Sequence, residues 1–370
     1  MSARFLTVVL ERAFNMRDGF GREIDYMRIS VIDSCNLNCY YCNPCDNNEH
    51  CHALNILSVK EVLCIVRAAT RLGIKHFRLT GGEPLLHPQL DEMVLQIKKI
   101  PGVSSVSLTT NAVLLAQHAK WLKEAGIDSI NVSLDTIDAS EYERITKKPL
   151  LEEVKHGINA AIECGIRVKI NVVLTPQTDV VALTRYVAKK GTDIRFIEMM
   201  PVGEGHTNGV EPYKKVIGTL SKLYGEPCRI NTEKTKEINS GNDKRKIPDN
   251  GPAEYYIFPE LDIRVGLIQA IHGKFCDTCN RIRVTADGRL MPCLGSSVTM
   301  DLVPDSWDFA DDVEKDFAIV RALRAAIKAK PRCHNFNDNA VTYTKTTETK
   351  TTEIEAAEVN AARNMSRIGG

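Results

Sequence analysis

Long apolar runs, an excess of one charge and a high aromatic content are all missing from this chain of 370 residues. No apolar stretch approaches the roughly 18 residues that a membrane helix needs, and residues 5–10 are short even for the core of a secretory signal. The net charge is +1 and aromatic residues make up 6%, which gives no indication of a nucleic-acid-binding surface. We therefore expect a cytoplasmic enzyme that binds neither membranes nor nucleic acids.

A catalytic triad is also missing. The nine histidines are scattered along the chain, and His272 is as readily explained by a structural role. A reaction in which a bound cofactor supplies the difficult chemistry would need no such triad.

Two cysteine triplets are the strongest functional signal in the chain. One lies in CNLNCYYC, after an apolar run at residues 26–32, and the other in FCDTCNRIRVTADGRLMPC. Three thiolates are one short of a closed zinc site, whereas a 4Fe-4S cluster held by three cysteines keeps one iron open. Cysteines at metal-binding spacing point to a reducing cell interior rather than to disulfides. We expect two 4Fe-4S clusters, bound by Cys35, Cys39 and Cys42 and by Cys276, Cys279 and Cys293.

A zinc knuckle is the alternative at the first triplet. Four further cysteine and histidine side chains follow it within ten residues and could supply a fourth ligand: Cys45, His50, Cys51 and His52. Spacing alone leaves this alternative open.

The spacer of the second triplet predicts a strand and a hairpin. Arg281 and Arg283 alternate with apolar residues, and Asp287 followed by Gly288 is a strong turn signal. One strand face therefore presents two guanidiniums beside the cysteines, which suits an anionic substrate because guanidinium binds phosphate oxygens bidentately. A solvated strand face is the alternative.

The first two hundred residues alternate strands and helices. Period-two patterns predict strands at residues 26–32, 75–80, 103–109, 129–134, 167–174 and 193–200. Helical patterns lie at residues 58–72, after Pro88, and at residues 114–125, 151–164 and 180–190. Six alternations predict an α/β fold, an incomplete (β/α)6 barrel of the TIM type with its chemistry at the carboxyl ends of the strands. The cysteine-containing region after about residue 213 would close the open side.

CxxxCxxC together with GGEP at residues 81–84 resembles the signature of the radical S-adenosylmethionine (SAM) superfamily. Most of the chain is further similar to the GTP 3′,8-cyclase (MoaA) family, in segments such as RISVIDSCNLNCYYCNP, FRLTGGEPLL, IRFIEMMPVG, KAKP and the terminal MSRIGG. The resemblance implies a lyase that converts GTP to (8S)-3′,8-cyclo-7,8-dihydroguanosine 5′-triphosphate, the first step of molybdenum cofactor biosynthesis. A 5′-deoxyadenosyl radical would take hydrogen from the ribose, and the ribose carbon would then attack carbon 8 of guanine.

The resemblance also implies roles for particular residues. The first triplet would hold the cluster that binds S-adenosylmethionine, and the cofactor would be surrounded by Gly81, Gly82, Glu83, Thr109, Ser133 and Met200. The second triplet would hold the substrate cluster. Cations would bind the triphosphate or the purine: Arg28, Arg78, Lys169, Arg195, Arg281 and Arg283. Arg281, Arg283 and the terminal Gly369 and Gly370 would assist catalysis.

Partners follow from the same resemblance. They are GTP, an electron donor such as a flavodoxin or ferredoxin system, and a downstream cyclic pyranopterin monophosphate synthase. A homodimer is also compatible with the resemblance.

The chain departs from the family pattern at Ser34, Asn43 and Ala112, and His76 stands where a lysine is usual. A neutral imidazole would weaken phosphate binding unless Lys75 substitutes.

The predicted organisation has four parts. Residues 1–212 form the partial barrel, residues 213–336 the second cluster region, residues 337–362 a polar insert of disordered composition, and residues 363–370 a flexible tail. Two other classes of protein stay open: a radical SAM peptide-modifying enzyme with an auxiliary cluster, and a noncatalytic zinc protein.

Overall fold

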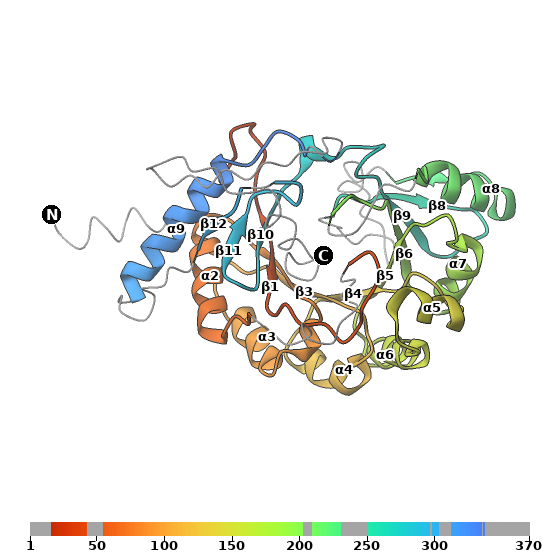
Figure 1. Ribbon diagram of the computed structural model, residues 1–370, viewed down its shortest axis with the longest axis horizontal. Coiled ribbons are helices and arrows are strands. Elements are labelled where there is room, and N and C mark those ends of the chain that lie inside the picture. Colours follow the sequence, from red (N-terminus) through yellow and green to blue (C-terminus); the bar gives the residue numbers. More distant parts are fainter. Residues whose placement is uncertain are drawn as a thin grey trace, which may run out of the picture.

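One twelve-stranded sheet runs through the computed structural model, in the order β12-β11-β10-β1-β2-β3-β4-β5-β6-β9-β8-β7 (Figure 1). The structure describes residues 16–42, 55–202, 209–230, 251–296, 298–302, 312–334 and 336. The strands are β1 (Tyr26–Ser30), β2 (His76–Thr80), β3 (Ser105–Thr110), β4 (Ser129–Ser133), β5 (Val168–Val173), β6 (Asp193–Ile197), β7 (Cys228–Arg229), β8 (Glu254–Ile257), β9 (Arg264–Ile268), β10 (Arg281–Val284), β11 (Arg289–Met291) and β12 (Met300–Asp301).

Helices cover the outside of the curved sheet (Figure 1). They are α2 (Val59–Arg71), α3 (Leu90–Lys98), α4 (Leu115–Glu124), α5 (Ala139–Thr146), α6 (Leu151–Glu163), α7 (Val180–Lys189), α8 (Gly218–Tyr224) and α9 (Asp312–Lys328), with shorter turns at Pro84–Leu86, Tyr213–Ile217 and Cys276–Thr278. The predicted alternation of strands and helices is confirmed. For example, Ser58 and Glu61 form a capping box that starts α2 where the sequence indicates. None of the described helices has the length and apolar character needed to cross a membrane.

The C-terminal region continues the barrel instead of only covering its open side. Strand β9 pairs in parallel with β6, and β10 pairs in parallel with β1, with Arg28 opposite Arg283. The parallel part therefore consists of β10, the strands β1 to β6, and β9. Antiparallel strands extend both ends, and β7 and β12 do not meet in the part of the chain that the structure describes. The barrel is thus incomplete, as expected, but it is wider than six strands.

The parallel strands alternate between side chains buried in the core toward the helices and side chains toward the barrel interior. In β2, Phe77 and Leu79 are fully buried in the core, whereas Arg78 faces the interior. Strand β10 repeats the pattern, with Ile282 in the core and Arg283 in the interior. Because side chains alternate along a strand, the register that buries the core also places the charges inside the barrel.

Two helices that the sequence analysis did not assign support the site. Helix α9 packs against α2, where Arg71 and Asp316 form an ion pair at 2.8 Å. Helix α5 supports the first cysteine loop, because the carbonyls of Ile145 and Thr146 accept hydrogen bonds from the amides of Tyr40 and Asn38 at 3.1 and 3.0 Å.

Candidate functional site

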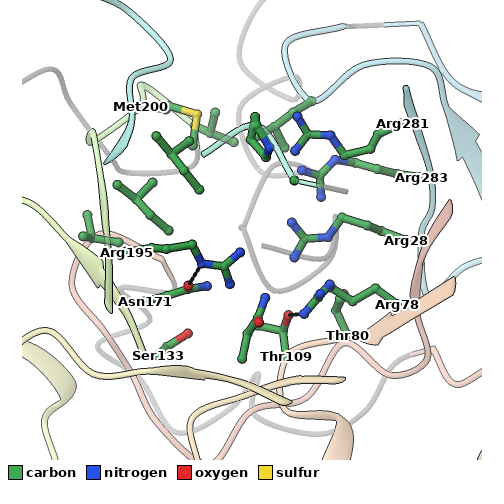
Figure 2. Close-up of a pocket in the computed structure, with 18 of the residues that line it drawn as sticks. Arg28, Arg78, Thr80, Thr109, Ser133, Asn171, Arg195, Met200, Arg281 and Arg283 are labelled. Carbon is green, nitrogen blue, oxygen red and sulfur yellow. Dashed lines mark hydrogen bonds between the residues drawn. The ribbon is translucent and has the colours of Figure 1, made fainter. Parts of the chain in front are cut away.

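A cavity of about 380 Å³ lies inside the barrel. Its lining includes both cysteine triplets and every other predicted site residue that lies in the described part of the chain: Gly81, Gly82, Glu83, Thr109, Ser133, Met200, Arg28, Arg78, Lys169, Arg195, Arg281 and Arg283. Figure 2 shows arginines from β1, β2 and β10 on one wall facing Arg195 on the other. Gly369 and Gly370 lie outside the described residues, as do Cys45, His50, Cys51 and His52.

The GGEP segment packs directly against the backbone of the first cysteine loop. The amide of Gly82 donates to the Ile32 carbonyl and that of Glu83 to the Ser34 carbonyl, each at 2.7 Å. A Cβ atom on Gly82 would lie 2.1 Å from the Ser34 carbonyl oxygen, a contact that no side chain can make. The glycine is therefore required by this backbone contact, whatever else approaches it.

Glu83 connects the GGEP segment to the end of β3. Its carboxylate accepts hydrogen bonds from Thr110 Oγ1 at 2.6 Å, the Asn111 amide at 2.7 Å and the Leu85 amide at 3.1 Å. Burial raises the pKa of Glu83 to about 7, although these hydrogen bonds act in the opposite direction. Glu83 lines the cavity, and much of its hydrogen-bonding capacity is used to hold the loop.

The first triplet lies among groups that disfavour thiolates. Burial, followed by the charge of Glu83, raises the pKa of Cys35 to about 12. Burial, Cys42 and Asp135 raise that of Cys39 well above its usual value. Asp135 accepts a hydrogen bond from Tyr41 at 2.5 Å, and burial raises its own pKa to about 6. In the apo-protein these thiols therefore stay protonated at neutral pH, and a metal has to displace their protons.

The donor set of the first triplet fits an iron–sulfur cluster. Cys35 Sγ accepts hydrogen bonds from the Leu37 amide at 3.4 Å and from Asn111 Nδ2 at 3.8 Å, the kind of contact that a ligating thiolate receives. Among the described residues, no group of three or more His, Cys, Asp or Glu side chains is placed to hold a single metal ion. Cysteines around a cluster bind separate iron atoms, so they need not converge on one point.

In the second triplet burial raises the pKa of Cys276, whereas Cys279 lies beside two cations. Cys276 opens a short turn before β10, and Cys293 follows β11. Burial alone would raise the pKa of Cys279, but the charges of Arg281 and Lys330 outweigh it and lower that pKa to about 7. This thiol is partly ionised at neutral pH before any metal binds.

Guanidiniums crowd the wall formed by β1, β2 and β10. Burial and repulsion by Arg281 lower the pKa of Arg283 to about 10, and burial and Arg283 lower that of Arg28 well below its ordinary value. Arginine keeps its charge in proteins, so this depression shows how strongly the wall favours an anion. The pKa of Tyr26 is lowered on balance: burial acts to raise it, but the charges of Arg78 and Arg28 outweigh burial.

Hydrogen bonds fix the orientation of several cavity cations. Arg78 donates to the Tyr26 hydroxyl at 2.5 Å and to the Leu108 carbonyl at 3.2 Å. On the opposite wall, Arg195 Nε donates to Asn171 Oδ1 at 2.9 Å (Figure 2). Lys169 Nζ lies 5.8 Å from the centre of the Tyr255 ring. These contacts preorganise positive charge from several strands around one space.

One cation of the cavity was not predicted from the sequence, and one residue expected to affect phosphate binding lies elsewhere. Arg167, directly before β5, lines the cavity, and its buried Nε atom has no hydrogen-bond partner among the described residues. A cation at the first position of the predicted strand was the available signal. His76 does not line the cavity; it hydrogen-bonds Ser105 at 2.8 Å, and Lys75 does not line it either. Neither His76 nor Lys75 therefore supplies a cation to the cavity, where a phosphate-binding lysine was expected.

Comparisons with known proteins define the class. Residues 29–182 match the model of the radical SAM superfamily, and residues 192–336 match that of Molybdenum Cofactor Synthesis C. Among solved structures, Streptococcus suis SuiB bound to S-adenosylmethionine superposes with a TM-score of 0.52 at 16% identity, covering 80% of this chain and 68% of that one. Native anSMEcpe with bound AdoMet gives 0.51 at 17%, covering 82% and 84%. The fold is that of a radical SAM enzyme, a class that implies a 4Fe-4S cluster and S-adenosylmethionine.

Curated relatives narrow the class to one family. The GTP 3′,8-cyclase of Clostridium perfringens is 35% identical over 324 residues, 87% of this chain and 95% of the relative. The GTP 3′,8-cyclases of Pelotomaculum thermopropionicum and Peptoclostridium acidaminophilum are 36% and 37% identical, over 86% and 87% of this chain and 95% and 94% of theirs. The chain belongs to the GTP 3′,8-cyclase family of radical SAM enzymes.

Proposed function

We propose that this protein converts GTP to (8S)-3′,8-cyclo-7,8-dihydroguanosine 5′-triphosphate, the first step of molybdenum cofactor biosynthesis. The proposal is carried by one observation: both cysteine triplets and all six predicted cations line the same cavity. Family membership supports the same activity.

Cys35, Cys39 and Cys42 are proposed to hold the cluster that binds S-adenosylmethionine. Gly81, Gly82, Thr109, Ser133 and Met200 line the cavity, and we assign them to the cofactor. Glu83 would act chiefly by holding the loop through Thr110 and Asn111. When bound, the cluster and S-adenosylmethionine supply a radical that removes a hydrogen atom from the substrate.

The cations are proposed to bind and orient GTP. A triphosphate carries several negative charges, and binding it would relieve the repulsion between Arg28 and Arg283. Arg78 and Arg195 are already held by hydrogen bonds, so less ordering is needed when the substrate binds. Lys169 and Arg281 complete the set. Enclosure in the cavity limits access of water and fixes the ribose relative to the purine.

The second triplet is proposed to hold another 4Fe-4S cluster, by Cys276, Cys279 and Cys293. Cys279 is already partly ionised in the apo-protein, which favours binding of a metal there. The guanine of GTP would bind at this cluster, next to Arg281 and Arg283. Gly369 and Gly370 are proposed to assist catalysis from the C-terminal tail.

The remaining partners are part of the same proposal. The reaction needs an electron donor, such as a flavodoxin or ferredoxin system, and its product would pass to a cyclic pyranopterin monophosphate synthase. We place the enzyme in the cytoplasm, and a homodimer is compatible with the proposal.

The test is a turnover assay on anaerobically reconstituted protein with S-adenosylmethionine, a reductant and GTP, followed by chromatography. We expect 5′-deoxyadenosine that depends on GTP and a nucleotide product of the same mass as GTP with a different retention time. Deoxyadenosine that forms equally without GTP would move the substrate elsewhere and revive the peptide-modifying alternative. A colourless protein that contains zinc and no iron would contradict both.

A further inference from the structure

Lys330 is a lysine whose side chain is almost fully inside the protein. Its exposed fraction is 2%, although a lysine is almost never buried without partners, because removing an ammonium from water is costly. The residue follows the end of α9, and its Nζ donates to the Arg281 carbonyl at 2.7 Å and to the Pro292 carbonyl at 2.8 Å. Two strong acceptors therefore compensate the buried charge.

Both carbonyls belong to segments that carry cysteines of the second triplet. Arg281 lies two residues after Cys279, and Pro292 directly precedes Cys293. The charge of Lys330 also acts on Cys279, whose pKa it lowers together with Arg281. One ammonium group thus connects the two segments and faces a thiol between them.

The third cysteine of the triplet is tied to the same stretch of chain by a second buried cation. Arg22 donates to the Cys276 carbonyl at 2.7 Å and to the carbonyls of Pro331 and Arg332 at 2.6 and 2.9 Å. Asp18 holds this guanidinium through an ion pair of 2.5 Å, and its own side chain is fully buried. Residues 330–332 are therefore a common anchor for all three cysteine segments.

We propose that Lys330 is a positioning residue for the second triplet, which holds the Cys279 and Cys293 segments together and keeps a fixed positive charge beside the cluster. The inference rests on the proposed function, because it needs a cluster at this triplet. A fixed positive charge stabilises the reduced, more negative state of a cluster, so Lys330 raises the reduction potential.

The test uses the full chain with Cys35, Cys39 and Cys42 replaced by alanine, so that any cluster present is at the second triplet. In this parent we compare Lys330→Met with Lys330→Gln, which is neutral but still donates hydrogen bonds, and with Lys330→Arg, which keeps the charge. Lys328→Met is the matched control, because Lys328 is an exposed lysine two residues away. The readouts are iron per chain, the rate of iron loss to a chelator, and the midpoint potential from a redox titration followed by electron paramagnetic resonance.

We expect about four irons per chain in the parent, as for one cluster. Lys330→Met should lose iron at least several-fold faster and shift the reduction equilibrium about tenfold toward the oxidised state, which is about 59 mV for a one-electron couple. Lys330→Gln should show the lowered potential with slower iron loss than Lys330→Met. Lys330→Arg should restore much of the potential, and Lys328→Met should match the parent.

Different results overturn different statements. A parent that binds no iron would contradict the proposed second cluster, and the inference with it. A parent with four irons and unchanged potentials in both neutral variants would overturn the inference alone. Should Lys330→Met fail to fold, as judged by circular dichroism, Lys330→Gln decides: an unchanged potential in that variant rejects the role of the charge.

Discussion

The two cysteine triplets face one cavity, but Cys35 of the first and Cys279 of the second lie in opposite electrostatic surroundings. Around the first, buried carboxylates such as Glu83 contribute to a raised thiol pKa, which reaches about 12 for Cys35. Around the second, Arg281 and Lys330 lower the pKa of Cys279 to about 7. Cysteines of one cavity are therefore placed both in a carboxylate-rich half and in a cation-rich half.

This difference matches the charges of the two molecules that the proposed reaction brings together. S-adenosylmethionine carries a positive sulfonium, which suits the side of the cavity that contains Glu83 and Asp135. GTP is a polyanion, which suits the side that contains Arg28 and Arg283. The charge distribution can therefore direct each molecule to its own half and reduce exchange between the halves.

Replacing the triplets one at a time has the largest expected effect. Alanine at Cys35, Cys39 and Cys42 should abolish cleavage of S-adenosylmethionine below detection, because the cluster that reduces it is lost. Alanine at Cys276, Cys279 and Cys293 should leave about four irons and slow cleavage of S-adenosylmethionine, without conversion of GTP. Iron analysis and chromatography of 5′-deoxyadenosine check this. Identical behaviour of the two variants would show that the halves are not specialised.

The thiols of the apo-protein should react at very different rates. The thiolate is the nucleophile, so at pH 7 iodoacetamide should label Cys279 at least about 100-fold faster than Cys35. Labelling of Cys279 should rise with pH through about 7 and then level off, whereas labelling of Cys35 should still be rising at pH 10, since its pKa is about 12. Peptide mass spectrometry gives both rates, and exposed Cys228 is an internal reference. Equal rates at pH 7 would contradict the electrostatic contrast.

Removing one cation of the cavity should weaken the binding of GTP and leave the binding of S-adenosylmethionine unchanged. Arg78→Met deletes a guanidinium that Tyr26 and the Leu108 carbonyl hold in the cavity. A hydrogen bond to a charged group is worth about 1.5–3 kcal/mol, so the Kd for GTP should rise roughly 10-fold to 100-fold. Anaerobic equilibrium dialysis measures both ligands. Arg185→Met, on the exposed face of α7, is the control and should change neither. Weaker binding of both ligands in Arg78→Met would mean that the halves are not separate.

The smallest expected effect concerns backbone strain beside the first triplet. Among described residues other than glycine, Ala112 and Lys147 alone have positive φ, at 66° and 61°. Ala112 directly follows Asn111, which contacts Cys35. Left-handed backbone costs alanine about 1–2 kcal/mol, and losing a buried methyl group costs about 0.8 kcal/mol, so Ala112→Gly should stabilise the apo-protein by up to about 1 kcal/mol. A thermal melt shows this as a higher Tm; a lower Tm would mean that packing of the methyl group outweighs the strain.

The sequence was sufficient to predict the parts that local patterns encode. Period-two strands, the helix that begins after Ser58 and the Asp287–Gly288 turn each have a local signal, and the six predicted cations do line one cavity. Pairing of β9 with β6 and β10 with β1 joins segments about 70 and 250 residues apart, for which spacing offers no signal.

The anchor of the second triplet was missed for the same reason. KAKP was recognised as a family segment, but no local pattern shows that Lys330 is buried against the Arg281 and Pro292 carbonyls. Nothing in the sequence near Arg22 indicates that it reaches Cys276. The domain limits, the insert and the glycine tail stay predictions, and the last two lie entirely outside the described residues.

The most direct test of two specialised halves is electron paramagnetic resonance of the reduced, reconstituted protein before and after each ligand is added. With about eight irons per chain, two overlapping cluster signals are expected. S-adenosylmethionine should change only the signal that is absent when Cys35, Cys39 and Cys42 are alanine. GTP should change only the signal that is absent when Cys276, Cys279 and Cys293 are alanine. A GTP-induced change that persists without the second triplet would contradict the account.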